Sequence, residues 1–385
     1  MQHSTERILT THTGSLPRPH ALLDLMKARA SGEPVDDATY DARLRAAVAA
    51  IVRQQVEHGV DVVTDGEQSK LGFATYVRER LAGFEPRPRE RAGSFAAEMA
   101  AFPEYYEQYF QRAMTGGRVV ARVEALTCVG PISYRGQEAI QRDIANLQAA
   151  VQGAGATEVF MPAIAASHIG NNEYYRTEEE YLAAIADAMH EEYQAIVDAG
   201  FLLQVDDPGL AGIFSNPALD PAEQRRQGEV AVEAINHALR GIPVERVRFH
   251  TCYGINEGPR VHDAPLSALV DVILKINAGA YSFEAANARH EHEYHVWERV
   301  KLPAGKILIP GVITHASNIV EHPEWIAERI TRYAERVGRE NVIAGTDCGF
   351  SSQATYTPEV HPTVMWAKFD AMAEGARLAS EQLWR

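Results

Sequence analysis

The sequence predicts an α/β protein whose fold is a single (β/α)8 barrel, or TIM barrel. Short β-branched or apolar runs recur along the 385 residues, and each is followed by a longer segment with helical periodicity. This alternation is typical of parallel βα units, and one decorated barrel fits the chain length. Because no internal repeat, low-complexity tract or linker divides the chain, we expect one domain over residues 1–385.

Nine segments are candidate strands, one more than an eight-stranded barrel requires. They are ILTTHTG (8–14), VDVVTDGE (60–67), EALTCVGPIS (124–133), TEVFMPAIA (157–165), FLLQVDDPG (201–209), VRFHTCYG (247–254), AYSFEAAN (280–287), KILIPGVITH (306–315) and NVIAGTDCGF (341–350). We expect TEVFMPAIA to be the extra strand, or to pair outside the ring.

The clearest helix is predicted over residues 177–200. Thr177 and Glu180 form a capping box at its start, and Gly200 is a typical stop signal. Between them, apolar residues recur at helical spacing, namely Leu182, Ile185, Met189 and Ile196.

The region 83–117 interrupts the alternation of strands and helices. It contains Pro86, Pro88 and the aromatic cluster FPEYYEQYF. We expect a long excursion after the second strand, such as a helical hairpin or a lid.

The charge balance and the amino-terminal segment exclude several classes of function. The net charge is −15 and no Lys/Arg-rich run occurs, so nucleic acid and anionic membranes are not expected partners. Neither a signal-peptide pattern nor an apolar run of roughly 20 residues is present, and we expect a cytoplasmic protein. Three cysteines are too few for a disulfide framework.

Ionisable or metal-binding residues stand at the ends of the candidate strands. These residues are Glu67, Asp206, His250, Cys252, Glu284, His315 and Cys348. In a (β/α)8 barrel the carboxyl ends of the strands meet on one face, so distant residues can form one site. His250 and Cys252 are two apart on a strand and therefore point the same way. With Cys348 and one carboxylate, best Glu284, they would form a ligand set suited to tetrahedral Zn²⁺.

Other readings apply to some of these residues. Glu67 and Asp206 could instead cap the helices that follow them. Cys128 is expected to be a packing residue. The segment ARHEHEYHVW lacks the His-Glu-x-x-His spacing of metalloproteases, so its three histidines are predicted mostly on a helix surface, namely His290, His292 and His295.

Seven motifs, taken in order, resemble those of the cobalamin-independent methionine synthase family. They are THTGSLPRP, GVDVVTDGE, QVDDPGL, FHTCYG, YSFEAAN, GVITHAS and GTDCGF, between about residues 11 and 351. The resemblance is to the carboxyl-terminal catalytic barrel of that family and to its shorter single-barrel relatives. It implies the following roles: zinc ligands His250, Cys252, Glu284 and Cys348; Glu67 and Asp206 at the amino group of homocysteine; Gly14 and Ser15 at its carboxylate; and His315 for proton handling.

Three features depart from the full-length synthases. This chain has one barrel rather than two. Where those synthases place a tryptophan for the pterin, this sequence continues GPISYRGQEAIQRD, with Tyr134 as the nearest aromatic residue. The segment INEGPRVHDAPL is an insertion that resembles the single-barrel relatives, one of which joins the thiol of coenzyme M to epoxides. It adds Arg260 near the strand-end loops, where Arg18 and Arg289 are also expected.

We therefore expect a zinc-dependent thiol S-methyltransferase that converts homocysteine to methionine through a zinc-bound thiolate. One alternative uses the same thiolate on an epoxide, as in a coenzyme M transferase, and another is a non-catalytic barrel stabilised by zinc. The expected partners are a small-molecule thiol and a methyl or alkyl donor. The sequence leaves open a homo-oligomer and a corrinoid or folate donor partner.

Overall fold

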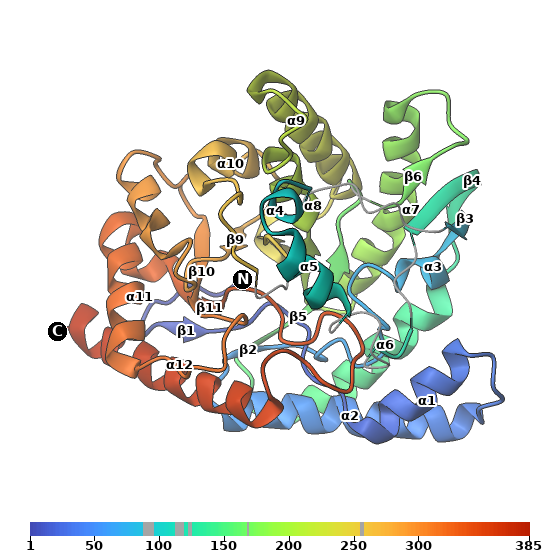
Figure 1. Cartoon of the computed structure of the whole chain (residues 1–385). Coiled ribbons are helices and arrows are strands. Elements are labelled where there is room, and N and C mark those ends of the chain that lie inside the picture. Colours follow the sequence, from blue (N-terminus) through green and yellow to red (C-terminus); the bar gives the residue numbers. More distant parts are fainter. Residues whose placement is uncertain (88–95, 112–118, 122–124, 168, 255–257) are drawn as a thin grey trace.

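The computed structural model describes residues 1–87, 96–111, 119–121, 125–167, 169–254 and 258–385. Eight parallel strands form a barrel (Figure 1). In spatial order they are β1 (Leu9–Thr10), β11 (Ile343–Thr346), β10 (Ile307–Ile313), β9 (Ala280–Phe283), β8 (Val247–Thr251), β7 (Leu202–Asp206), β5 (Glu158–Ile164) and β2 (Val62–Val63). A parallel bridge between Thr11 and Val62 joins the two ends of this sheet. The predicted fold class is confirmed.

Helices surround the barrel, as Figure 1 shows. They are α1 (His20–Ala30), α2 (Asp37–Glu57), α6 (Gln137–Val151), α7 (Glu178–Asp198), α8 (Pro208–Phe214), α9 (Pro221–Ala238), α10 (Leu266–Ile273), α11 (Pro323–Val337) and α12 (Pro362–Leu383), with the 3-10 helices η2 (Val244–Arg246), η3 (Glu291–Glu298) and η4 (Arg339–Asn341). Helix α7 follows its prediction, because Thr177 accepts a hydrogen bond from the backbone N–H of Glu180 at 3.1 Å. Among the described residues, no helix is long and apolar enough to cross a membrane.

The prediction of which strand is extra was wrong. The segment 157–165 contains β5, which pairs with β2 and β7 inside the barrel. The strand outside the ring is β4 (Ala125–Tyr134), which forms a second sheet with β3 (Leu81–Arg87) and β6 (Asn171–Asn172). Most of β5 is buried, whereas more than half of β4 is partly or fully exposed. Continuous burial is typical of a strand in a covered parallel sheet.

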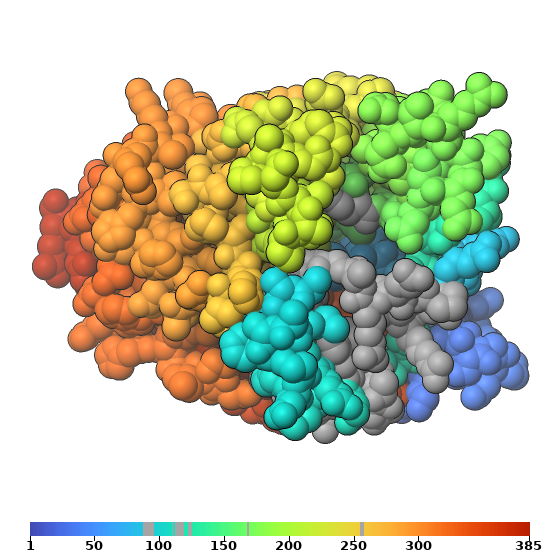
Figure 2. All heavy atoms as spheres, turned by 45° about the horizontal axis from the view of Figure 1, so that its top comes forward, coloured from blue at the N-terminus to red at the C-terminus, as the bar shows by residue number. Residues whose placement is uncertain are grey.

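The excursion after the second barrel strand begins as a strand and continues as two helices. Strand β3 pairs antiparallel with β4, and the helices are α4 (Ala96–Ala101) and α5 (Pro103–Phe110). Residues 88–95 and 112–117 of the predicted excursion lie outside the described residues. Figure 2 shows the two helices, coloured teal, on the molecular surface.

Contacts fix the excursion above the loops that follow β8 and β11. Glu98 of α4 accepts a hydrogen bond from the backbone N–H of His262 at 2.7 Å. The hydroxyl of Tyr109 in α5 donates to Glu359. Because these loops follow parallel strands, the excursion covers part of the carboxyl face of the barrel.

Candidate metal centre

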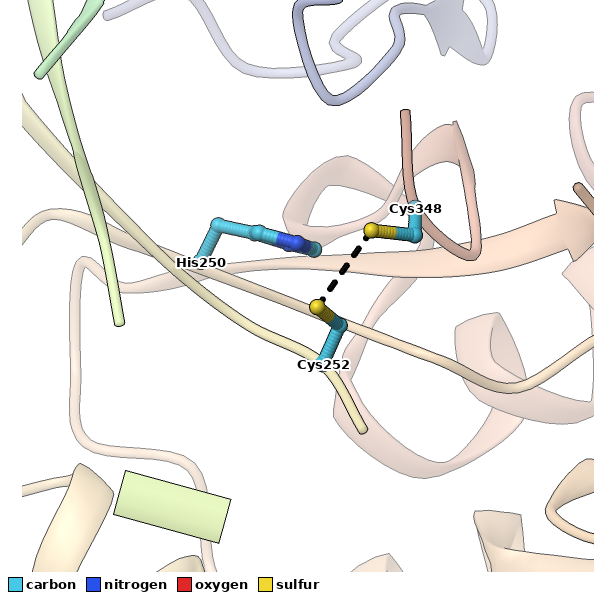
Figure 3. Close-up of side chains that lie close together, drawn as sticks. All are labelled: His250, Cys252 and Cys348. Atoms are coloured by element: carbon cyan, nitrogen blue, oxygen red, sulfur yellow. Dashed lines mark hydrogen bonds between the residues drawn. The ribbon is translucent and has the colours of Figure 1, made fainter. Parts of the chain in front are cut away.

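Two cysteines and one histidine meet at the carboxyl end of the barrel. His250 lies in β8, Cys252 follows that strand, and Cys348 follows β11. One donor atom of each lies within 4.8 Å of the others, and the two Sγ atoms are 3.3 Å apart. Figure 3 shows the imidazole of His250 directed toward both sulfur atoms. The structure brings these three residues together, and their role as ligands stays a prediction.

The surroundings of these three donors fit a soft divalent metal. All three side chains are buried, and Nε2 of His250 has no hydrogen-bond partner within the described part of the chain. A buried polar atom without a partner is costly, and a metal ion would remove that cost. The contact between the two sulfur atoms lowers the pKa of Cys252 and raises the pKa of Cys348. This favours one thiolate in the pair. Two sulfur atoms and an imidazole are a donor set typical of zinc.

The ring of His250 is oriented by a neighbour on the next strand. Its Nδ1 lies 3.3 Å from the hydroxyl oxygen of Ser282 in β9. Such a contact to the second ring nitrogen leaves Nε2 free to face the sulfur atoms, as in many metal-binding histidines.

Glu284, the predicted fourth ligand, is held by an arginine. Its Oε1 accepts from the backbone N–H of Tyr253 at 2.9 Å and from Nη2 of Arg260 at 3.0 Å. Its Oε2 accepts from Nη1 of Arg260 and from the side-chain amide of Asn287 at 2.8 Å. Burial alone would raise the pKa of Glu284, but Arg260 lowers it to about 2. The carboxylate is therefore charged, and it falls outside the group formed by His250 and the two cysteines.

Glu284 forms a second cluster with His315 and Asp347, whose ligand atoms also lie within 4.8 Å of one another. Oδ1 of Asp347 accepts from the backbone N–H groups of Ala285 and Ala286, both at 2.7 Å. Its Oδ2 accepts from the backbone and the side chain of Asn287. A carboxylate has about four acceptor positions, and all of them are used here. Asp347 therefore fixes the segment after β9 and is a poor candidate for a second metal site.

His315 lies beside this cluster with both ring nitrogens free of hydrogen bonds, as far as the described residues show. Its side chain is 3% exposed. Burial lowers the pKa of His315, and the nearby charge of Glu284 opposes this only in part. The imidazole is thus neutral near pH 7 and able to take up a proton.

Glu67 and Asp206 lie in one group of charges with a lysine. Oε1 of Glu67 lies 3.2 Å from Nζ of Lys70, while its Oε2 has no partner among the residues that the structure describes. Oδ1 of Asp206 accepts from Gln204 at 2.8 Å. Burial raises the pKa of Asp206 to about 7, and the charges of His250, Glu67 and Lys70 also act on it. Asp206 therefore lies close enough to both His250 and Glu67 to interact with their charges.

The alternative role of these carboxylates as helix caps is excluded. Helix α8 is capped by Asp207, whose side chain accepts from the backbone N–H of Leu210, and not by Asp206. The next helix after Glu67 begins at Val77. Glu67 instead adopts a left-handed backbone with φ of 56°, which is uncommon for a residue with a side chain.

Ser15 lies against the segment that carries Cys348, whereas Gly14 lies close to Pro162. The backbone carbonyl of Ser15 accepts from the N–H of Phe350 at 2.9 Å, and its hydroxyl lies 3.3 Å from that of Ser352. A Cβ atom at Gly349 would lie 2.0 Å from the Ser15 hydroxyl oxygen, so a larger residue there would force the Ser15 side chain to move. Gly14 has a φ of 142°, a conformation that also favours glycine.

One histidine prediction was wrong. His290 is buried rather than on a helix surface, with Nε2 at 3.1 Å from Asp263 and Nδ1 at 2.9 Å from Glu293. Its ring stacks on Tyr253 at a centroid distance of 4.2 Å. His292 and His295 are exposed, as predicted.

Sequence reasoning missed Lys70 and Asp347, and it did not foresee the partner of Arg260. Asp347 stands directly before Cys348, so its position beside a candidate ligand was the available signal. Cys128 is buried in β4, away from the barrel strands, as expected for a packing residue.

The sequence was compared with known proteins. Residues 8–123 and 132–368 match the family described as cobalamin-independent synthase, catalytic domain. The methionine synthase of Sulfolobus acidocaldarius is 24% identical over 345 residues, covering 88% of this chain and 85% of that protein. The methionine synthase of Saccharolobus solfataricus is 24% identical over 381 residues, covering 98% and 96%. A B12-independent methionine synthase from Shewanella sp. W3-18-1, solved with selenomethionine, has a TM-score of 0.75 at 18% identity and covers 98% and 99%, which supports the fold.

Proposed function

The chain belongs to the cobalamin-independent methionine synthase family, and on this premise we propose that it is a zinc-dependent thiol S-methyltransferase that forms methionine from homocysteine. The observation that carries the proposal is the meeting of His250, Cys252 and Cys348 at the carboxyl end of the barrel. Structural zinc sites usually gather their ligands in short closed knuckles, whereas these ligands come from two separate strands. This favours a catalytic site over a barrel that zinc merely stabilises.

When bound, zinc would lower the pKa of a substrate thiol and keep it as a nucleophilic thiolate. The residues of the chain would bind the rest of homocysteine. Glu67 and Asp206 offer carboxylate oxygens for its ammonium group. Oε2 of Glu67 has no partner in the described part of the chain, which supports this assignment. Gly14 and Ser15 would receive its carboxylate, and Ser15 lies beside the Cys348 segment.

The reaction forms one bond between sulfur and the methyl carbon and breaks the bond between that carbon and the donor. The thiol proton is lost in every case. With a folate donor the leaving nitrogen gains a proton, whereas a methyl-corrinoid or a positively charged methylated donor leaves with the bonding electron pair and takes up none. Neither ring nitrogen of His315 has a hydrogen-bond partner among the described residues, and His315 lies close to Glu284, so it can pass a proton at this point. We therefore assign His315 the proton-transfer role.

The share of each relative that this chain matches supports methionine synthase activity in a chain of this size. The alignments cover 85% and 96% of the two archaeal proteins named methionine synthase. Candidate methyl donors are a folate and a methyl-corrinoid protein. A cytoplasmic location remains part of the proposal.

The test is a product assay with the zinc-loaded protein. Homocysteine is supplied with methylfolate, methyl-corrinoid or a small methylated donor, and coenzyme M is supplied with an epoxide in parallel. We expect methionine from at least one methyl donor. Alkylation of coenzyme M without any methionine would instead establish the epoxide-type activity.

A further inference from the structure

The carboxylate of Glu284 is already committed to an arginine. Arg260 forms a two-pronged ion pair with it, and Tyr253 and Asn287 supply the other two donors. All of the roughly four acceptor positions of the carboxylate are therefore in use. Glu284 can bind a metal only if it gives up at least one of these contacts.

Arg260 is fixed in this position by its own loop. It has a left-handed backbone with φ of 59°, and its backbone carbonyl accepts from Nε of Arg289 at 2.9 Å. Its Nη2 donates to the carbonyl of Gly254 at 3.0 Å, and its Nε lies 3.4 Å from Asp263. The side chain of Arg260 is thus held before any substrate arrives.

Residues His262 and Asp263, which follow Arg260, are held by contacts from other elements. Glu98 of helix α4 accepts from the backbone N–H of His262, two residues after Arg260. His290 contacts Asp263 at 3.1 Å from the other side. The residues that follow Arg260 are therefore held by the excursion and by His290 at the start of η3, so the position of Arg260 does not depend only on its attraction to Glu284.

We propose that Arg260 is a positioning residue that holds Glu284 away from the donors His250, Cys252 and Cys348, and that it thereby weakens metal binding. With Glu284 held by the guanidinium, one metal position would be available to a substrate thiol. This inference rests on the proposed function, because it assumes that the two cysteines and His250 hold a metal. The positive charge of a buried arginine also repels a metal cation directly, which lowers metal affinity without any contact to Glu284. The double variant below distinguishes this charge effect from the contact.

The test is a double-mutant cycle on zinc affinity, measured by competition with a chromogenic chelator. Arg260→Met should raise the zinc association constant at least about tenfold, since it frees Glu284. Glu284→Gln alone should change the constant less than about threefold, and Arg260→Met/Glu284→Gln should lose most of the rise. Arg299→Met removes an exposed charge at the end of η3 and should leave the constant unchanged.

A second readout is the visible absorption spectrum of bound Co²⁺, which reports the set of metal ligands. Arg260→Met should change the spectrum, and the added Glu284→Gln change should reverse it. Arg260→Lys keeps the positive charge without the two-pronged contact, and it should raise zinc affinity if Arg260→Met does not fold.

Three results would overturn the inference. They are an unchanged zinc constant in both Arg260 variants, a rise that persists in the double variant, and a loss with Glu284→Gln alone as large as that with Cys348→Ser. Failure of the wild-type protein to bind zinc would instead refute the proposed function.

Discussion

The sulfur atoms of Cys252 and Cys348 lie 3.3 Å apart, although 96 residues separate them along the chain. They meet because β8 and β11 are parallel strands of one barrel, so both cysteines lie at its carboxyl end. The imidazole of His250 points at the same place (Figure 3). A metal ion is the simplest common partner for these three buried donors.

We predict that the purified protein holds about one zinc per chain, and that Cys252→Ser and Cys348→Ser each lower zinc affinity at least about 100-fold. Loss of a residue that only hydrogen-bonds to a metal ligand costs about 10- to 100-fold in metal affinity, and loss of a ligand should cost more. Elemental analysis after dialysis measures this. Cys128→Ser is the matched control, because Cys128 lies in β4 outside the barrel. Full zinc occupancy in both ligand variants would contradict the prediction.

The barrel and the convergence of the site were predictable from the sequence, whereas the partner of Glu284 was not. Apolar strand runs that end in ionisable residues are a local pattern, and parallel strand order then brings His250, Cys252 and Cys348 together. The contact between Arg260 and Glu284 depends on how the loop after β8 folds back, and no local pattern specifies that. The strand error has a similar cause, because β4 and β5 are both apolar runs followed by helices. They differ in which neighbours cover them.

The second prediction concerns the methyl donor. Tyr134, the aromatic residue nearest to the Gly-Pro segment of β4, donates its hydroxyl to Glu192 at 2.7 Å, and its side chain is 7% exposed. Its ring is therefore not free to stack on a pterin. Because an aromatic stacking contact is worth about 1–3 kcal/mol, we expect methyltetrahydrofolate to be at least about tenfold poorer in kcat/KM than a small methylated donor or a methyl-corrinoid.

Steady-state rates with mono- and triglutamyl methylfolate measure this. Tyr134→Phe serves as the control: it should lower stability by about 1–3 kcal/mol through the lost hydrogen bond to Glu192, while the ratio between donors stays the same. A Tyr134→Phe effect confined to the folate donor, or efficient turnover of methylfolate by the wild-type protein, would show that the pterin binds here after all.

The third prediction is a pH dependence of stability that originates at His290. Burial alone would lower the pKa of His290, but its hydrogen bonds to Asp263 and Glu293 raise it from 6.5 to about 9. Because the folded pKa lies above the unfolded one, the stabilisation is complete below about pH 6.5 and is lost as the pH rises through about 9. The loss should be of the order of 3 kcal/mol.

Urea unfolding of the metal-free protein between pH 6 and 9.5 measures this dependence. Without metal, metal binding does not contribute to the unfolding free energy. His290→Asn should flatten the decline in unfolding free energy over that window. His292→Asn, at an exposed position two residues away, should not. An equally steep decline in His290→Asn would assign the effect to other groups.

The last prediction concerns which thiol binds. Homocysteine brings an ammonium group, whereas coenzyme M brings a sulfonate. Above about pH 7, where Asp206 is ionised, Glu67 and Asp206 carry two negative charges, and Lys70 beside Glu67 offsets only one of them. A close charge pair is worth roughly 1–4 kcal/mol here, depending on the local dielectric, so homocysteine should bind more tightly than coenzyme M. Asp206→Asn should weaken homocysteine binding by at least about fivefold and reduce the difference in affinity between the two thiols.

Calorimetry with zinc-loaded protein, in buffers of different ionisation enthalpy, measures the affinities and the proton released by each thiol. Tighter binding of coenzyme M, or improved homocysteine binding in Asp206→Asn, would show that these carboxylates do not hold an amine.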